Sequence, residues 1–247
     1  MRRVTANINN DVAYIVPLTD THIGDPGFTE RKLRHYIDWI LEREHCYVML
    51  LGDIFETPIS GSRATNVWEL KNGLSPMEAE ATAIDIFTPI ASRIVGVVEG
   101  NHELRSTQMT GTSSLIRLSQ ALDLMDVYDK KVVRVKLSVR DIDYNIVGTH
   151  GWGGARLLGG QLNKIASMSN VTADADVFVT GHEHSLVLAR HEVDLEREGF
   201  ELRQLYIGCG CFVEWTDFQQ GIQRAKPSIG APRIRFDGTR RDVHVSI

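Results

Sequence analysis

Short apolar segments that are rich in β-branched residues recur along the chain, and they restrict its fold more than any other feature. They are Val12–Leu18, Cys46–Leu51, Ile94–Val98, Val132–Val139, Tyr144–Val147 and Val177–Val179. Near-continuous apolar runs of this length indicate β-strands that are covered on both faces. A fold with buried sheets is therefore expected.

Segments with helical periodicity separate these strands. One face of residues 30–44 carries five apolar residues: Leu33, Tyr36, Ile37, Ile40 and Leu41. Ser75, Pro76 and Glu78 form a start signal for a helix over 75–91. Its expected core face is Met77, Ala81 and Ile84, with Phe87 as a further candidate. Residues 112–122 and 155–168 share the helical period, the latter through Leu158, Leu162, Ile165 and Met168. Strands that alternate with helices predict a layered α/β fold.

Beyond residue 185 the pattern changes to strands without helices between them. Two strands joined by residues 196–199 are expected. A further hairpin would pair 234–236 with 243–247 across Asp237 and Gly238. We predict one domain over residues 1–247, with 186–247 as its β-rich C-terminal part. Residues 54–74 are the least regular stretch and are interpreted as a cap or insert.

Composition and charge exclude several classes of protein. The chain is 43% hydrophobic and 24% charged, as globular proteins are. No apolar run could cross a bilayer and the three cysteines are too few for a disulfide framework, so we expect a cytoplasmic protein with no membrane partner. The net charge of −5 excludes a strongly basic nucleic-acid coat. Residues 221–247 are nevertheless basic, so the rest of the chain carries an excess of acidic residues. This excess could serve to bind cations, or it could simply form a solvated surface.

Polar motifs follow five of the predicted strands at the point where each strand ends. They are Asp20-Thr21-His22, Gly52-Asp53, Gly100-Asn101-His102-Glu103, Gly148-Thr149-His150-Gly151 and Gly181-His182-Glu183-His184. Because ligands bind outside the carboxyl ends of strands in α/β sheets, we expect these groups to meet at one rim.

The residue types in these motifs indicate a metal site. Carboxylate and amide oxygens mixed with imidazoles suit Mn²⁺, Fe or Zn²⁺, whereas Ca²⁺ prefers oxygen alone. Seven candidate ligands are more than one tetrahedral ion needs, so two divalent ions that share a bridging carboxylate are predicted, with Mn²⁺ favoured. Such pairs are typical of phosphoester hydrolysis.

The ordered set of five motifs resembles the calcineurin-like metallophosphoesterase superfamily, whose pattern is D-x-H, GD, GNH[DE], a Gly-flanked His and GHxH. The resemblance covers about residues 12–185, and it includes a vaguer similarity to compact phage and bacterial members. It implies an α/β fold that is a four-layer α/β/β/α sandwich, with two mixed β-sheets flanked by helices and a dimetal site at the strand ends.

The resemblance also implies roles for individual residues. Asp20, His22 and His184 would hold one ion, and Asn101, His150 and His182 the other, with Asp53 bridging the two. A hydroxide bridging the ions would attack phosphorus, and His102 would protonate the leaving oxygen as the general acid. Glu103 or Glu56 is expected to orient His102. We interpret Arg105 as a phosphate clamp, because a guanidinium matches a phosphate edge.

The sequence leaves the phosphoester substrate open. A phosphodiesterase acting on a nucleotide or nucleic acid is supported by basic residues near the motifs: Arg63, Arg105, Arg117, Arg156 and Lys164. Trp68, Trp152 and Trp215 are candidates for stacking on a base, although packing would explain them equally well. The alternatives are a phosphomonoesterase and, from a different class, a non-catalytic scaffold with the same fold. A homodimer could form through an edge of the late hairpins.

Overall fold

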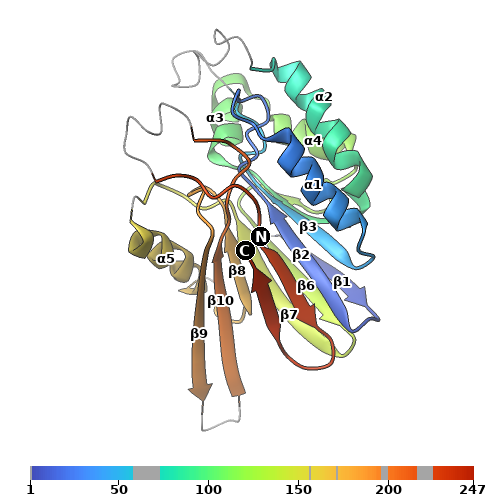
Figure 1. The fold of residues 1–247 in the computed structure, drawn as a ribbon, viewed down its shortest axis with the longest axis vertical. Coiled ribbons are helices and arrows are strands. Elements are labelled where there is room, and N and C mark those ends of the chain that lie inside the picture. Colours follow the sequence, from blue (N-terminus) through green and yellow to red (C-terminus); the bar gives the residue numbers. More distant parts are fainter. Residues whose placement is uncertain (1, 58–72, 156, 171, 196–199, 216–224) are drawn as a thin grey trace.

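Two six-stranded mixed sheets lie face to face between layers of helices (Figure 1). The computed structural model describes residues 2–57, 73–155, 157–170, 172–195, 200–215 and 225–247. The predicted four-layer α/β/β/α sandwich is confirmed.

The first sheet has the strand order β1-β6-β7-β8-β10-β9. Its strands are β1 (Arg2–Ile8), β6 (Val132–Val139), β7 (Ile142–Thr149), β8 (Val177–Thr180), β9 (Val187–Leu195) and β10 (Phe200–Gly208). Pairing is parallel for β1 with β6, β7 with β8 and β8 with β10, and antiparallel for β6 with β7 and β9 with β10.

The second sheet has the order β12-β11-β2-β3-β4-β5. Its strands are β2 (Val12–Leu18), β3 (Cys46–Leu51), β4 (Ile94–Val98), β5 (Tyr128–Asp129), β11 (Arg233–Asp237) and β12 (Val243–Ser246). β2, β3, β4 and β5 run parallel, and β11 and β12 continue the sheet in antiparallel fashion. The C-terminal part of the chain therefore contributes strands to both sheets.

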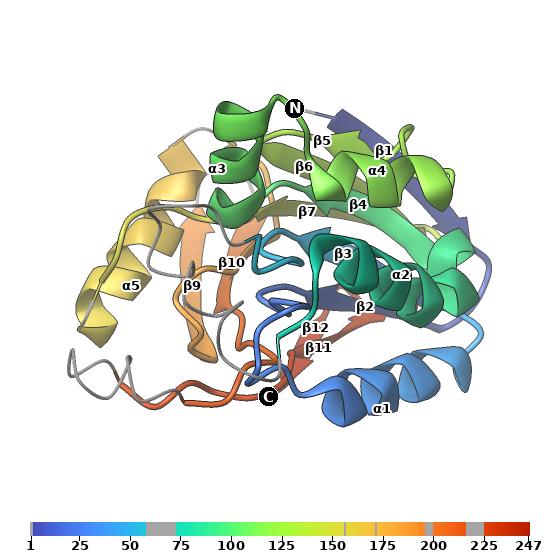
Figure 2. The ribbon, with the colours of Figure 1, turned by 90° about the horizontal axis from the view of Figure 1, so that it is seen from above.

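Helices cover the outer faces of both sheets (Figure 2). α1 (Glu30–Leu41), α2 (Pro76–Phe87) and α4 (Ser114–Ala121) pack on the second sheet, and α5 (Leu158–Ala166) packs on the first. α3 (Asn101–Thr110) begins directly after β4, and two 3₁₀ turns, Thr88–Arg93 and Ser167–Asn170, follow α2 and α5. No helix in the described ranges is both long and apolar enough to pass through a bilayer.

Alternation along the central strands builds separate cores on the two faces of a sheet. Val16 and Leu18 of β2 pack toward the helices, whereas Ala13 and Ile15 pack toward the other sheet. The sheets approach closely at Gly148, where a Cβ would lie 2.4 Å from Cε of Met49. This rigid double sheet fixes where its strands end.

Parts of the predicted helix faces were wrong. α2 buries Phe87 as predicted, but it exposes Met77 (82%), Ala81 and Ile84 (36%) and buries Ala79, Ala83 and Ile86 in their place. Apolar residues lie on more than one side of this helix, so its sequence period could not select the packed face. Leu41 and Leu158 are also exposed, because they end α1 and begin α5 beyond the sheets. The edge strands β1 and β5 were not predicted.

Candidate metal centre

The five motifs converge at one rim of the molecule, as predicted. Asp20 and His22 follow β2, Asp53 follows β3, and Asn101 and His102 open α3 after β4. The remaining histidines, His150, His182 and His184, follow β7 and β8 of the other sheet. The loops after β2 and β3 lie between α1 and α2 on one side and α5 on the other (Figure 2).

The backbone at these loops adopts conformations that most residues avoid. Five non-glycine residues of the motifs have positive φ angles: Asp20 (51°), His22 (47°), Asp53 (48°), His182 (74°) and His184 (55°). Such conformations cost about 1–3 kcal/mol each and persist only where the surroundings enforce them. Their concentration here indicates that the loops are shaped to aim side chains at a common point.

Glycines allow the loops to approach one another. A Cβ on Gly100 would lie 2.1 Å from Oδ1 of Asp53, and one on Gly181 would lie 2.2 Å from Oγ1 of Thr19. Gly52 has a φ of 78°, and its Cβ would lie 2.4 Å from the amide nitrogen of Gly100. The glycine in each of these motifs is thus required by contact with a neighbouring loop.

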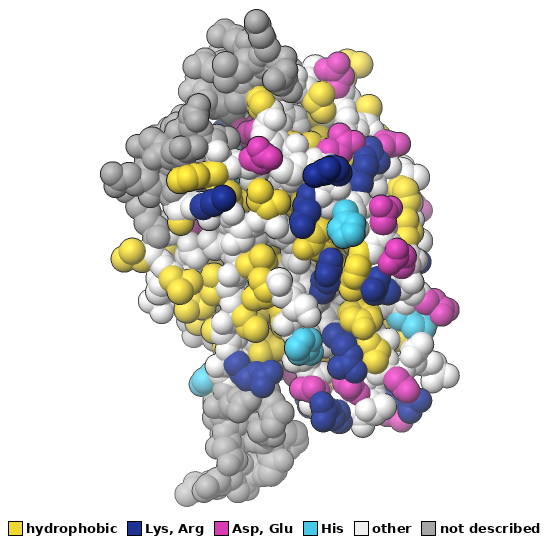
Figure 3. Space-filling model, in the orientation of Figure 1, with side chains coloured by type: hydrophobic (Ala, Val, Ile, Leu, Met, Phe, Trp, Pro, Cys, Tyr) yellow, Lys and Arg dark blue, Asp and Glu magenta, His cyan; other side chains and the backbone are white. Residues whose placement is uncertain are grey.

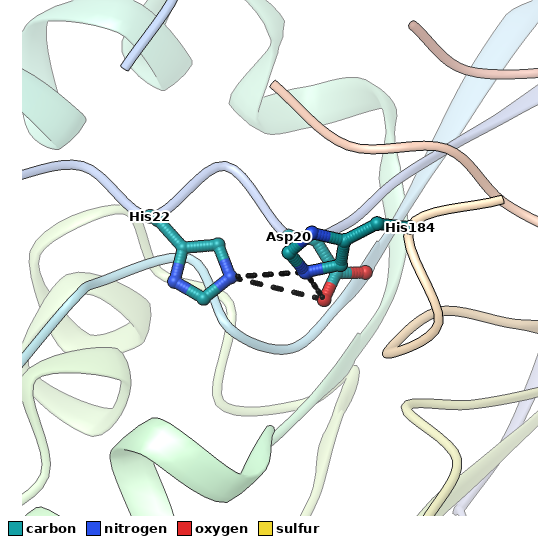
Figure 4. A group of neighbouring side chains, drawn as sticks. All are labelled: Asp20, His22 and His184. Carbon is teal, nitrogen blue, oxygen red and sulfur yellow. Dashed lines mark hydrogen bonds and ion pairs between the residues drawn. The ribbon is translucent and has the colours of Figure 1, made fainter. Parts of the chain in front are cut away.

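The first cluster consists of Asp20, His22 and His184 (Figure 4). Nε2 of His184 lies 3.3 Å from Nε2 of His22 and 3.2 Å from Oδ1 of Asp20. All three side chains are buried, and Asp20 Oδ1 has no hydrogen-bond donor among the described residues. A buried carboxylate oxygen that faces two imidazole nitrogens is the arrangement a cation requires.

Glu56 determines which nitrogen of His22 faces this cluster. Nδ1 of His22 lies 2.8 Å from Oε2 of Glu56, and because a carboxylate only accepts, Nδ1 donates, so in the neutral ring Nε2 has the lone pair that a metal ion would use. Burial opposes the protonated form of His22, but the hydrogen bond and charge of Glu56 raise the pKa of His22 to about 9. Burial likewise works against the charged form of Glu56, yet His22 lowers the pKa of that carboxyl.

The second cluster consists of Asp53, Asn101, His150 and His182. Nε2 of His150 lies 3.2 Å from Oδ2 of Asp53, 3.1 Å from Oδ1 of Asn101 and 3.3 Å from Nδ1 of His182. Nδ1 of His150 donates to the carbonyl of Leu51 over 2.8 Å, so in the neutral ring Nε2 has the lone pair that a metal ion would use. Burial opposes protonation of His150, but Asp53 and Asp20 raise its pKa to about 10.

Asp53 lies between the two clusters. Its Oδ1 accepts a hydrogen bond from the amide of His102 over 2.8 Å. Its Oδ2 faces His150 Nε2 at 3.2 Å and His22 Nε2 at 3.9 Å. Burial disfavours its charge, but His150, His102 and His22 hold its pKa well below the usual range. Every candidate metal ligand predicted from the sequence is therefore in one of two clusters that share this carboxylate.

His102 lies beside the two clusters, and its ring forms a third group of possible metal ligands with His22 and Asp53. Its Nε2 lies 3.9 Å from Asp53 Oδ2, its ring packs edge-on against His22 at 4.7 Å, and burial lowers its pKa. Glu56, one of the two glutamates predicted to orient it, contacts it twice. Its backbone carbonyl accepts from His102 Nδ1 over 2.8 Å, and its carboxylate, which is hydrogen-bonded to His22, lies 3.5 Å from the same Nδ1.

Glu103 has a different role from the predicted one. Its carboxylate accepts backbone hydrogen bonds from Asp53 (3.0 Å), Phe55 (3.0 Å) and Gly100 (2.9 Å), and so joins the loops after β3 and β4. Burial and the nearby charge of Asp53 raise the pKa of Glu103 to about 7.

Basic residues surround the site less densely than the sequence indicated. Nη2 of Arg105 lies 3.1 Å from His102 Nδ1, and its buried Nε has no hydrogen-bond partner among the described residues. Arg117 is paired with Glu80, and Lys164 with Glu183. Arg63 and Arg156 lie outside the described residues, as do Trp68 and most of the predicted insert at 54–74.

The basic C-terminal stretch is not a free cationic surface in its described part. Arg235, Arg240 and Arg241 form ion pairs with Asp237, Asp242 and Asp176, and Arg233 lies over the rings of Trp39 and Tyr36 at 4.6 and 5.0 Å. These contacts engage the positive charges of the four arginines within the protein.

Two contributors to the site were missed in the sequence. Oγ1 of Thr19 lies 2.7 Å from Oδ2 of Asp20 and 2.8 Å from the carbonyl of Leu51, so its single proton can be donated to either, and Leu51 supports His150 through the same carbonyl. The position of Thr19 directly before Asp20 was a usable signal. The role of Leu51 could not be recognised in the sequence, because it acts through its backbone carbonyl, which every residue has.

Comparison with known proteins gives similarities in overall fold. No family model and no curated relative matches the chain. A predicted phosphoesterase from Streptococcus pneumoniae is 14% identical with a TM-score of 0.42, covering 95% of this chain and 88% of that one. Vps29 from Entamoeba histolytica, complexed with zinc, is 14% identical with a TM-score of 0.41, covering 94% and 97%. GAP50 of Plasmodium is 8% identical with a TM-score of 0.45, covering 95% and 88%.

The two mixed sheets between helices are the architecture that the resemblance to the calcineurin-like metallophosphoesterases implied. The low identities and TM-scores say nothing about chemistry, so the functional argument depends on the site itself.

Proposed function

We propose that the chain is a metal-dependent phosphoesterase that hydrolyses a phosphodiester, with two divalent ions held at the two clusters. The observation that carries this is the pair of clusters around Asp53: imidazole nitrogens face carboxylate and amide oxygens at 3.1–3.2 Å. Without metal, the raised pKa values of His22 and His150 place protons between such atoms, and a divalent ion that displaces these protons would use the same lone pairs. Carboxylate, amide and imidazole donors without thiolate fit Mn²⁺, Fe or Zn²⁺.

Bound divalent ions would supply an activated water and positive charge for the phosphoryl oxygens. The chain supplies the rest. Asp20, His22 and His184 would hold one ion, Asn101, His150 and His182 the other, and Asp53 both. Asp53 also fixes His102 by accepting from its amide, and the carbonyl of Glu56 fixes the ring.

His102 would donate a proton from Nε2 to the leaving oxygen. Its Nδ1–H is held by the carbonyl of Glu56, so the ring presents Nε2 on the side of Asp53, at 3.9 Å from Oδ2. A pKa lowered by burial makes the protonated ring a readier donor. Arg105, beside His102, would contact a phosphoryl oxygen.

A diester fits this charge distribution better than a monoester. Of the three candidate cations that the structure describes, Arg117 and Lys164 are paired with glutamates, which leaves Arg105. A dianionic monoester needs more positive charge around it than a monoanionic diester does.

The test is hydrolysis by protein purified with Mn²⁺, measured with a nitrophenyl diester, a nitrophenyl monoester and single-stranded DNA. Turnover of the diester supports the proposal, and preference for the monoester would replace it with a phosphomonoesterase. No turnover with Mn²⁺, Fe²⁺ or Zn²⁺, in protein shown to contain metal, would indicate a non-catalytic scaffold.

A further inference from the structure

The loop after β7 presents an exposed tryptophan beside the second cluster. Trp152 is 52% exposed, although large aromatic side chains are usually well buried. It lies two residues after His150, so their Cα atoms are at most about 7.6 Å apart. The indole is therefore within reach of a group bonded to a phosphate at this cluster.

Contacts on both sides of Trp152 hold this loop in place. Gly151 and Gly153 have φ angles of 96° and 63°, and a Cβ on Gly151 would lie 3.5 Å from Cβ of His182. Further along, Oε1 of Glu183 accepts from the amide of Ala155 (2.9 Å) and from Lys164 Nζ (2.6 Å). A loop braced in this way offers the indole at a fixed position, which reduces the entropy lost when a ligand binds.

A flat, exposed indole next to a phosphate site suits a nucleobase. Stacking uses only the π-face that all bases share, so it needs no further polar contacts. The competing occupant, an acyl chain, would lie on Leu157 and Leu158 at the start of α5, which are 77% and 59% exposed. Hydrophobic side chains are visible at the surface in the region of α5 in Figure 3. A base is favoured because Trp152 and His182, a candidate metal ligand, lie on the same small hollow, so a base stacked on the exposed indole would remain close to a phosphate at the second cluster.

We infer that Trp152 is a stacking platform for the base of a nucleotide-containing phosphoester. This inference rests on the proposed function, since it takes the phosphate to be bound at the clusters.

The experiment compares a dinucleotide with the same dinucleotide made abasic at one position. Trp152→Ala should raise KM for the intact dinucleotide about tenfold. It should leave kcat, and KM for the abasic substrate, unchanged. Trp152→Phe should restore most of the loss, and the control Leu157→Ala should have no effect. Separately, a nucleoside monophosphate should quench the tryptophan fluorescence of zinc-loaded wild-type protein, and this quenching should be largely absent from Trp152→Phe.

Equal KM changes for both substrates, or none, would overturn the inference. A lipid ligand would also overturn it. The evidence for a lipid would be that Leu157→Ala loses binding to phosphatidylcholine vesicles while Trp152→Ala leaves KM for the intact dinucleotide unchanged. If the wild-type protein hydrolyses neither substrate, the proposed function fails. The fluorescence measurement then still decides whether Trp152 binds a base.

Discussion

The two clusters of the metal centre use similar donors but differ in exposure and support. Asp20, His22 and His184 are all buried, and a carboxylate, that of Glu56, backs His22. In the second cluster Asn101 is exposed and His182 half-buried, and a backbone carbonyl backs His150.

This difference predicts unequal roles for two similar sites. A carboxylate behind an imidazole makes it a more basic ligand than a carbonyl does, and it adds negative charge close to the ion. We expect the first cluster to bind its cation more tightly, and the second to be the side from which solvent and substrate enter.

The strongest test of this arrangement is Asp53→Asn, because Asp53 faces both clusters. Loss of its charge should release metal and lower kcat by about three orders of magnitude or more. Metal analysis of the purified variant and hydrolysis of the nitrophenyl diester measure the two effects. Metal lost from only one cluster would show that Asp53 does not bridge the two ions and that the two clusters are independent sites.

His102→Ala should separate chemistry from metal binding. Each cluster keeps its own donors when His102 is removed, although His102 also lies near His22 and Asp53, so the variant should keep most of its metal while kcat falls by about 10²–10⁴. Substrates with a better leaving group should lose less, since they need less protonation. Metal loss comparable to that of Asp53→Asn would overturn the assigned role.

The same contrast between clusters shows how far the sequence could predict the site. Side chains that act at the centre have residue types with metal-binding chemistry and follow strand ends, so Asp20, Asn101 and His150 could be found without a structure. Their supports could not be assigned, because Leu51 acts through a carbonyl and Glu56 through a contact with a residue 34 positions earlier.

The fold shows the same limit. The central strands were predicted because they are apolar on both faces. The packed face of α2 was not, because Met77 and Ile84 are as apolar as the residues that it buries. β1 alternates along its length at the edge of its sheet, so it lacks the continuous apolar run that marks the central strands. Packing against segments distant in the sequence determines which face of α2 is buried and whether β1 forms, and the local sequence pattern contains no information about that packing.

Glu56→Gln and Asn101→Ala should each weaken one cluster. Removing the charge behind His22 should lower the affinity of the tighter site about 10–100-fold, as changes of such supporting partners commonly do. Asn101→Ala should weaken the other site and leave the first unchanged. Calorimetric titration of chelator-treated protein with Mn²⁺ should show two unequal affinities in the wild type. Equal losses at both sites in either variant would contradict the proposed difference.

The smallest expected effect comes from Lys164→Met, which removes the partner of Glu183 between His182 and His184. The side chains are 25% and 13% exposed, so the free energy of unfolding should fall by about 1 kcal/mol, measured by urea denaturation. Lys136→Met, from a pair about half exposed on both sides, is the control and should cost about 0.5 kcal/mol or less. Metal content should be unchanged in both variants, because Lys164 braces the loop of Trp152 and touches neither cluster's donor atoms. Loss of metal from Lys164→Met alone would mean that the ion pair also positions His182, and that the open cluster depends on α5 for its geometry.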